Sequence, residues 1–179
     1  GYVAAVHAAE LGQKVTVIEE NDQLGGVCLR VGCIPSKALI QVSHDYQTTL
    51  HSADEGVAAS DVNLDWSKVQ GYRGSVVQRM TNGVAYLFKK NKIDVIHGRA
   101  FLKEQHSLRV MKGDSAQTYT FKNLIIATGS HPIEIPGFKF NGRVIDSTGL
   151  LELQQQPKEL VIIGGGYIGC ELASAYANF

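Results

Sequence analysis

The sequence has few cysteines and no excess of charge of either sign. Its three cysteines among 179 residues are too few for the disulfide framework of a small secreted protein. Seventeen basic and seventeen acidic residues give a formal net charge of zero. No broad positive field is therefore available to attract nucleic acid or an anionic membrane, and we expect neither as a partner.

Long hydrophobic runs are also missing. None approaches the roughly 20 apolar residues that cross a bilayer. Hydrophobic residues at 44% and charged residues at 19% suit a globular protein of about one domain. The sequence opens at Gly1, without an initiator methionine, inside an apolar pattern, and stops at Phe179 inside another. We therefore expect a fragment of a longer protein, which by itself binds its cofactors weakly and lacks turnover.

The hydrophobic pattern predicts alternating helices and strands. Helices are expected over residues 2–11, 33–50, 66–90 and 167–178. Strands are expected over residues 14–19, 93–102, 107–111, 117–121, 123–127 and 160–163. Residues 21–32 are expected as a loop, 51–64 as irregular chain and 131–158 as a connection between domains.

Several residues mark where these elements begin and end. Gly12 fits the end of the first helix, Pro35 the first turn of the second and Asp65 the cap of the third. The polar turn at 112–115 predicts a hairpin. The long third helix has an apolar stripe that consists of Val76, Val77, Met80, Val84, Leu87 and Phe88.

The order of elements indicates an α/β fold. Helix, glycine and strand over residues 2–19 form the second half of a βαβ unit. A second strand–glycine turn–helix follows over residues 160–178. Two such units suggest two nucleotide-binding domains in tandem.

The strongest chemical signal is the segment GGVCLRVGCIPSK, residues 25–37. Four residues separate Cys28 from Cys33, a spacing that can bring two Cα atoms within disulfide reach where a loop enters a helix. So short a ring constrains the unfolded chain little, which favours redox chemistry over a structural staple. A helix start near Cys33 favours its thiolate, and Lys37 lies one helical turn further on. Unpaired core thiols or two ligands of a zinc site remain as alternatives.

The stretch Gly164–Gly169 satisfies GxGxxG between a predicted strand and a predicted helix. In that context the glycines allow a tight turn and close approach of a pyrophosphate, and the helix start supplies positive potential. A glycine turn that packs without a ligand is the alternative. Glu19, which ends a predicted strand, suits a ribose hydroxyl in a dinucleotide fold, or is an ordinary surface glutamate. We expect Cys170 to be a packing residue.

Residues 25–37 resemble the redox motif of the flavoprotein disulfide reductases, the class I pyridine nucleotide-disulfide oxidoreductases. The ending CIPSKAL resembles the dihydrolipoamide dehydrogenase branch of this family more than its glutathione reductase branch. Arg30 stands where the family usually has asparagine. The resemblance implies an FAD-binding Rossmann-like domain with a three-layer ββα architecture over residues 1–140, with a small antiparallel β insertion. A second Rossmann-like domain, for NAD, would begin over residues 141–179.

The resemblance also implies roles for individual residues. Cys28 would exchange with the dithiol substrate, Cys33 would face the flavin, and Lys37 would stabilise reduced flavin. Glu171 matches a carboxylate that approaches this lysine, although an ordinary first-turn glutamate is the alternative. Residues implied to bind FAD are Gly1, Glu19, Gly25, Gly26, Val27, Cys28, Lys37, Ala100, Ala127, Thr128 and Gly129. Residues implied to bind NAD are Gly164, Gly166, Tyr167, Ile168 and Gly169.

The implied activity is oxidation of dihydrolipoamide through the Cys28–Cys33 disulfide, with electrons passed through FAD to NAD⁺. A homodimer, lipoyl-domain partners and a cytoplasmic location follow from that role. A glutathione- or mercuric-type reductase that uses NADPH, or an inactive FAD-binding module, are the alternatives. None of the six histidines has a neighbour at a spacing that suggests a catalytic pair.

Overall fold

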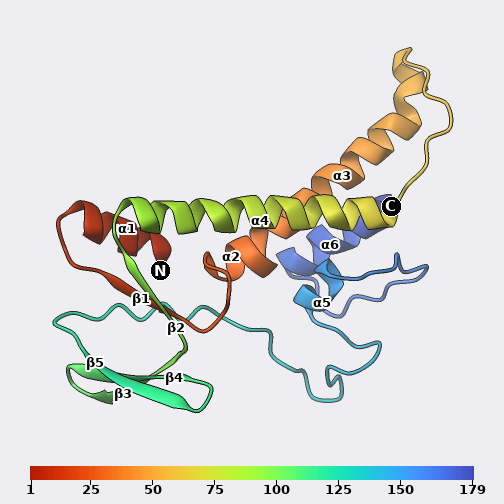
Figure 1. Ribbon diagram of the computed structural model, residues 1–179. Coiled ribbons are helices and arrows are strands. Elements are labelled where there is room, and N and C mark those ends of the chain that lie inside the picture. Colours follow the sequence, from red (N-terminus) through yellow and green to blue (C-terminus); the bar gives the residue numbers. More distant parts are fainter. The chain divides into compact units, whose positions relative to one another are not determined.

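The computed structural model of the protein describes all residues 1–179 and has a mixed α/β fold (Figure 1). It divides into two compact units. The first unit consists of residues 1–26 and 79–129, and the second of residues 27–78 and 130–179. The expected α/β class is confirmed.

The first unit begins with helix α1 (Tyr2–Glu10) and strand β1 (Thr16–Glu19). Gly12 follows the helix with a φ of 81°, in the left-handed region, and its amide donates to the carbonyl of Ala9. β1 pairs in parallel with β2 (Asp94–His97), so that Glu19 lies opposite His97. The predicted helix, glycine stop and strand are confirmed.

A small antiparallel sheet completes the first unit. It consists of β3 (Arg99–Glu104), β4 (Ser107–Lys112) and β5 (Ser115–Thr120), and the predicted hairpin between the last two is confirmed. The prediction of one strand over residues 93–102 was wrong. At Gly98, with a φ of 156°, the chain leaves the pairing with β1 and joins β4. A Cβ atom at this position would lie 2.6 Å from the carbonyl oxygen of Met111, which explains the glycine.

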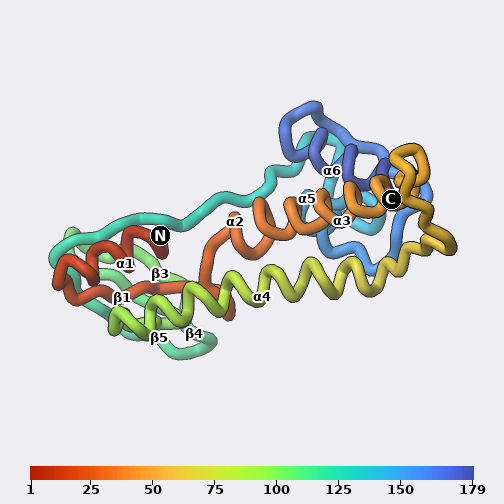
Figure 2. Tube along the Cα trace, turned by 90° about the horizontal axis from the view of Figure 1, so that it is seen from above, coloured from red at the N-terminus to blue at the C-terminus, as the bar shows by residue number.

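The second unit is helical. It contains α2 (Gly26–Val31), α3 (Cys33–His51), the 3₁₀ turn η1 (Ser52–Glu55), the first half of α4 (Trp66–Lys90), α5 (Ser147–Leu151) and α6 (Tyr167–Asn178). Figure 2 shows α6 running along α3. The core between these helices consists of Leu39, Trp66, Val69, Leu150, Leu151, Leu172 and Tyr176. α3 and α6, which carry the two predicted motifs, are thus packed against one core.

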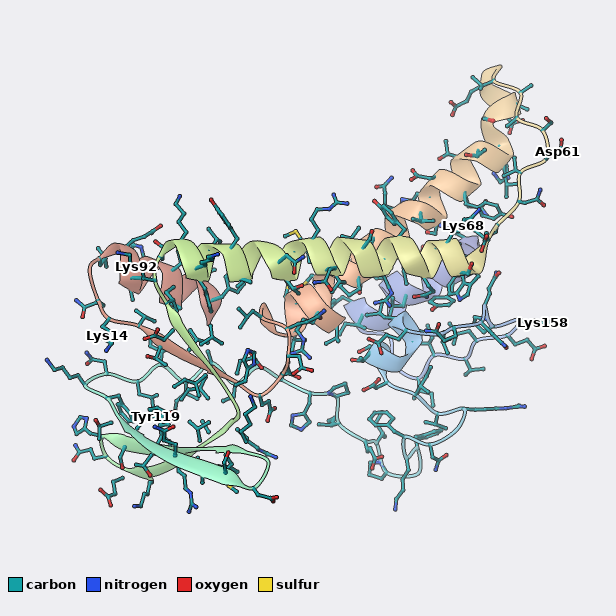
Figure 3. All side chains as sticks on the ribbon, in the orientation of Figure 1. Lys14, Asp61, Lys68, Lys92, Tyr119 and Lys158 are labelled. Atoms are coloured by element: carbon teal, nitrogen blue, oxygen red, sulfur yellow. The ribbon has the colours of Figure 1, made fainter.

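The predicted long helix α4 is confirmed, but part of its apolar stripe was wrong. Val77, Val84 and Phe88 are buried, whereas Met80 and Leu87 are 41% and 36% exposed. The buried face instead includes Thr81, so that it recurs at helical spacing from Val77 to Phe88. After α4, Lys92 (labelled in Figure 3) takes a left-handed φ of 54°.

The predicted N-terminal cap of α4 is present. One carboxylate oxygen of Asp65, Oδ1, accepts from the Ser67 hydroxyl at 2.6 Å and from the backbone amide of Lys68 at 3.2 Å. Lys68 is labelled in Figure 3. The hydrogen bond from Ser67 and that from Lys68 lower the pKa of Asp65. The ionised carboxylate therefore satisfies a backbone donor that the helix itself leaves free.

We predict that Asp65→Ala lowers the thermal unfolding midpoint of the protein, because the cap is lost. Asp65→Asn keeps a side-chain acceptor for the helix amide, so its unfolding midpoint should stay close to that of the unmodified protein. Since folding lowers the pKa of Asp65, its contribution is present above the ordinary aspartate pKa and is lost as the pH falls through the folded value. The Ala penalty should therefore shrink in acid when midpoints are measured across pH. A penalty that is equal at pH 7 and pH 2.5 would contradict this account.

Two predicted strands were wrong. Residues 123–127 and 160–163 have no strand pairing, and Ile125 is 68% and Val161 86% exposed. An apolar run predicts a buried strand only where a neighbouring strand supplies hydrogen bonds, and no other segment of this chain does so here. The expected loop over 21–32 contains α2, and the expected connection over 131–158 contains α5.

No helix has the length and apolar character of a membrane span.

Candidate active site

The two cysteines of the motif are held by a close contact between consecutive helices. Cys28 lies in the first turn of α2, and Cys33 is the first residue of α3. Between them, Gly32 brings its Cα so near to α2 that an added Cβ would lie 3.0 Å from the Val27 carbonyl oxygen and 3.3 Å from Cys28 Cα. A side chain at Gly32 would therefore push Cys28 away from the start of α3.

The start of α3 is further fixed by Ser36. Its hydroxyl donates to the carbonyl of Gly32 at 2.8 Å, and its amide donates to the same oxygen at 3.1 Å. Ser36 and Pro35 are buried, whereas Cys28 and Cys33 are exposed. The two thiols are thus exposed, while the residues that fix the start of α3 are buried.

The environment of Cys28 depends on its partner thiol. A side-chain hydrogen bond with Cys33 is the main cause that raises the pKa of Cys28, followed by burial and by the charge on Cys33. The Lys37 ammonium acts in the opposite direction and lowers this pKa. In the reduced pair, the Cys28 proton is therefore retained by contact with Cys33.

We predict that Cys33→Ala increases the rate at which iodoacetamide alkylates reduced Cys28 at pH 7.5 several-fold. The variant removes the contact that raises the pKa of Cys28 and leaves the lowering effect of Lys37 in place. Peptide mass spectrometry over a pH series measures the rate at this cysteine alone. Lys37→Met is the opposite control. It removes the positive charge that lowers the pKa of Cys28, so alkylation of Cys28 should be slower. An unchanged or slower reaction in Cys33→Ala would refute the assignment.

Lys37 and Glu171 form an ion pair between α3 and α6. The lysine Nζ lies 2.8 Å from Oε1 and 2.7 Å from Oε2 of the glutamate, so both carboxylate oxygens are engaged. The hydrogen bond with Glu171 is the main cause that raises the pKa of Lys37. The side chains are 59% and 37% exposed, and exposed pairs contribute little stability. The contact therefore places the ammonium without contributing much to the stability of the fold.

Glu171 is not a helix-capping residue. α6 has no acidic residue in its first turn, so the alternative of a first-turn glutamate that favours the helix dipole does not apply. The structure thus brings together all four predicted catalytic side chains: Cys28 contacts Cys33, Lys37 pairs with Glu171, and Lys37 lies near enough to the thiols to affect the pKa of Cys28. The expectation that Cys170 is a packing residue was wrong, because the side chain is exposed, with its Sγ 3.6 Å from the Gly165 carbonyl oxygen.

The glycine turn before α6 has the geometry that its sequence predicts. Gly164 has a φ of 112°, and Gly166 precedes the first helical residue in an extended conformation. A Cβ on Gly169 would lie 2.6 Å from the Gly164 carbonyl oxygen and 3.1 Å from Ile162 Cγ2. Tyr167 is 78% and Ile168 45% exposed, so the outer side of the turn is open. In a dinucleotide-binding turn the earlier glycines leave room for the pyrophosphate, and the last glycine lets the helix pack closely against the strand. The open space at Gly164 and Gly166 and the close contact at Gly169 match these roles.

Most of the other predicted cofactor residues lie in the first unit, whereas Val27 lies in the second, in α2. Glu19 ends β1, and its Oε1 accepts hydrogen bonds from Asn21. Gly1 lies against Ala127, at 3.4 Å between an added Cβ and that of the alanine. Ala100 lies in β3, opposite Val110, and is exposed.

Sequence reasoning missed three features of the site. These are the helix α2 around Cys28, the close approach at Gly32 and the contact of Asn21 with Glu19. Only the close approach at Gly32 had a signal in the sequence, which was the glycine between the two cysteines. Side chains that could hold a metal ion do not gather in groups of three or more.

The chain is similar to known proteins along its whole length. All residues 1–179 match the family model described as pyridine nucleotide-disulphide oxidoreductase. Proteins named dihydrolipoyl dehydrogenase are 59% identical in Geobacillus stearothermophilus and 60% identical in Bacillus subtilis, over the whole chain and 38% of each relative. The chain therefore spans less than half the length of these relatives.

A solved structure is also similar. The Cu(II) complex of the HOCl-induced flavoprotein disulfide reductase RclA from Escherichia coli superimposes with a TM-score of 0.85 at 33% identity. The match covers 100% of this chain and 38% of that one. Taken with the paired thiols and the glycine turn, these similarities show that the chain belongs to the pyridine nucleotide-disulphide oxidoreductase family.

Proposed function

We propose that the protein containing this chain is an FAD-dependent oxidoreductase that oxidises dihydrolipoamide to lipoamide and passes the electrons to NAD⁺. The observation that carries the proposal is the exposed pair Cys28 and Cys33, in hydrogen-bond contact with each other and with Lys37 close enough to affect the ionisation of Cys28. Relatives that are 59–60% identical over the whole chain bear the name of that activity.

Cys28 and Cys33 of this chain supply both enzyme sulfur atoms of the disulfide exchange. A substrate thiolate attacks Cys28 Sγ of the oxidised pair, breaks the Cys28–Cys33 bond and leaves Cys33 as a thiolate. The second substrate thiolate then attacks the substrate sulfur of the mixed disulfide and releases Cys28. The substrate loses two electrons and two protons as it closes its own disulfide. The cysteine pair gains the electrons, Cys28 takes up one proton as a thiol, and the other proton is released to solvent while Cys33 stays a thiolate. The nearby Lys37 ammonium acts to lower the pKa of Cys28.

The residues fit the cofactors that this activity requires. When bound, FAD supplies the two-electron transfer between the dithiol and NAD⁺. Glu19 offers a carboxylate for the ribose of FAD, and Lys37 offers positive charge for reduced flavin. Gly1, Ala127 and Gly129 offer backbone with little or no side chain, and Thr128 offers its backbone and a hydroxyl. The turn at Gly164–Gly169 offers the pyrophosphate of NAD a helix start with open space around Gly166. The remaining proposed FAD contacts are Gly25, Gly26, Val27 and Ala100.

The proposal extends to the protein's surroundings. A homodimer, lipoyl domains of 2-oxo acid dehydrogenase complexes as partners, and a cytoplasmic location belong to the proposed role. The test is to purify the whole protein and measure its flavin content and its formation of NADH from dihydrolipoamide and NAD⁺. One FAD for each chain and dithiol-dependent NADH formation are expected. Flavin without turnover would favour an inactive FAD-binding module, and a preference for NADP⁺ would favour a glutathione- or mercuric-type reductase.

A further inference from the structure

The carboxylate of Glu19 is held by hydrogen bonds from Asn21. Its Oε1 accepts two hydrogen bonds from the same residue, one from the backbone amide of Asn21 at 3.0 Å and one from the side-chain amide Nδ2 at 2.6 Å. These two hydrogen bonds orient the carboxyl group through its Oε1 atom.

Asn21 is itself fixed by the neighbouring strand. Its carbonyl oxygen lies 3.1 Å from Nδ1 of His97, the residue that pairs with Glu19 across β1 and β2. The next residue, Gly98, donates its amide to the Glu19 carbonyl at 2.9 Å. The strand end and the asparagine after it are thus attached to β2 at two points, so the Nδ2 donor has a defined position.

We infer that Asn21 is a positioning residue, which orients the Glu19 carboxylate toward the hydroxyls of the adenosine ribose of FAD. The inference rests on the proposed binding of FAD by Glu19. A free glutamate side chain would lose rotational freedom when it bound the ribose, and Asn21 has already removed that freedom before the ligand arrives. Hydrogen bonds to an ionised carboxylate are also among the stronger ones in proteins.

A purely structural role for Asn21 makes a different prediction. Asparagine and aspartate both form the local turns that follow strands, so either would serve if the residue only shaped the chain. Aspartate has nearly the same size but offers no Nδ2 donor and places a negative charge beside Glu19. Asn21→Asp therefore separates orientation of the carboxylate from formation of the turn.

The experiment measures FAD affinity of the flavin-free whole protein by quenching of flavin fluorescence. We expect Asn21→Ala to weaken binding about tenfold and Asn21→Asp to weaken it further. In a Glu19→Ala background, Asn21→Ala should change the affinity less than twofold, because the group that it positions is gone.

Two results would overturn the inference while leaving the proposed function intact: FAD affinity in Asn21→Asp within twofold of the unmodified protein, or the same loss from Asn21→Ala with and without Glu19. If the unmodified protein binds no FAD at all, the proposed function fails and the inference fails with it.

Discussion

Cys28→Ser in the whole protein is expected to reduce dithiol oxidation by about a thousand-fold or more. Serine cannot form the mixed disulfide that the exchange requires, and Cys33 alone cannot close an intramolecular one. The start of α3 stays intact, because Gly32 and Ser36 fix it without the Cys28 side chain. Flavin binding and the proposed contact of Cys33 with the flavin should therefore survive, so the variant remains yellow but inactive toward the dithiol.

Cys170→Ser is the matched control for this prediction. The side chain is also an exposed cysteine in the second unit, and its Sγ contact is only with the Gly165 carbonyl. Its activity should stay within about twofold of the unmodified protein. Normal dihydrolipoamide oxidation in Cys28→Ser would show that the roles of the cysteines are assigned wrongly.

Gly169→Ala is expected to destabilise the turn before α6 by about 1–3 kcal/mol and to weaken NADH binding at least tenfold. In an ordinary helix position, this substitution stabilises by about 1 kcal/mol, so the expected sign is reversed. The reason is the 2.6 Å approach of the added Cβ to the Gly164 carbonyl oxygen, which is backbone and can move only with the whole turn.

Gly165→Ala provides the comparison within the same turn. An added Cβ there meets no atom within 4 Å, and the residue does not have a positive φ. Its thermal unfolding midpoint should match that of the unmodified protein. Thermal unfolding and NADH titration of both variants test the prediction, and a Gly169→Ala protein as stable and as tightly binding as Gly165→Ala would disprove it.

The sequence predicted those elements whose signals are local. The helix ends at Gly12 and Asp65 depend on backbone donors and acceptors within one turn, and both are confirmed. The hairpin around Gly113 and the helix after Gly166 depend on similarly short-range geometry.

Features that depend on distant partners were predicted less well. Ile125 and Val161 belong to apolar runs, but no strand of this chain pairs with them. The break at Gly98 depends on contact with Met111, which lies on another strand. Met80 and Leu87 fit an apolar stripe, yet on α4 the buried residues are their neighbours Thr81 and Phe88.

The candidate site shows the same division. The proximity of Cys28 and Cys33 could be predicted from their spacing in the sequence. The contact of Lys37 with Glu171 joins residues 134 positions apart, and its prediction came only from the family resemblance. The contact of Asn21 with Glu19 spans two residues, but asparagine after a strand is common and gives no sign of which carboxylate it meets.

The central claim is that Cys28 and Cys33 form a redox pair that works with a flavin. The most direct measurement is the visible spectrum of the whole protein during anaerobic titration with dihydrolipoamide. A new long-wavelength band is expected as the dithiol is added, because the Cys33 thiolate donates charge to oxidised flavin. Bound flavin whose spectrum develops no such band would contradict the redox role of both cysteines.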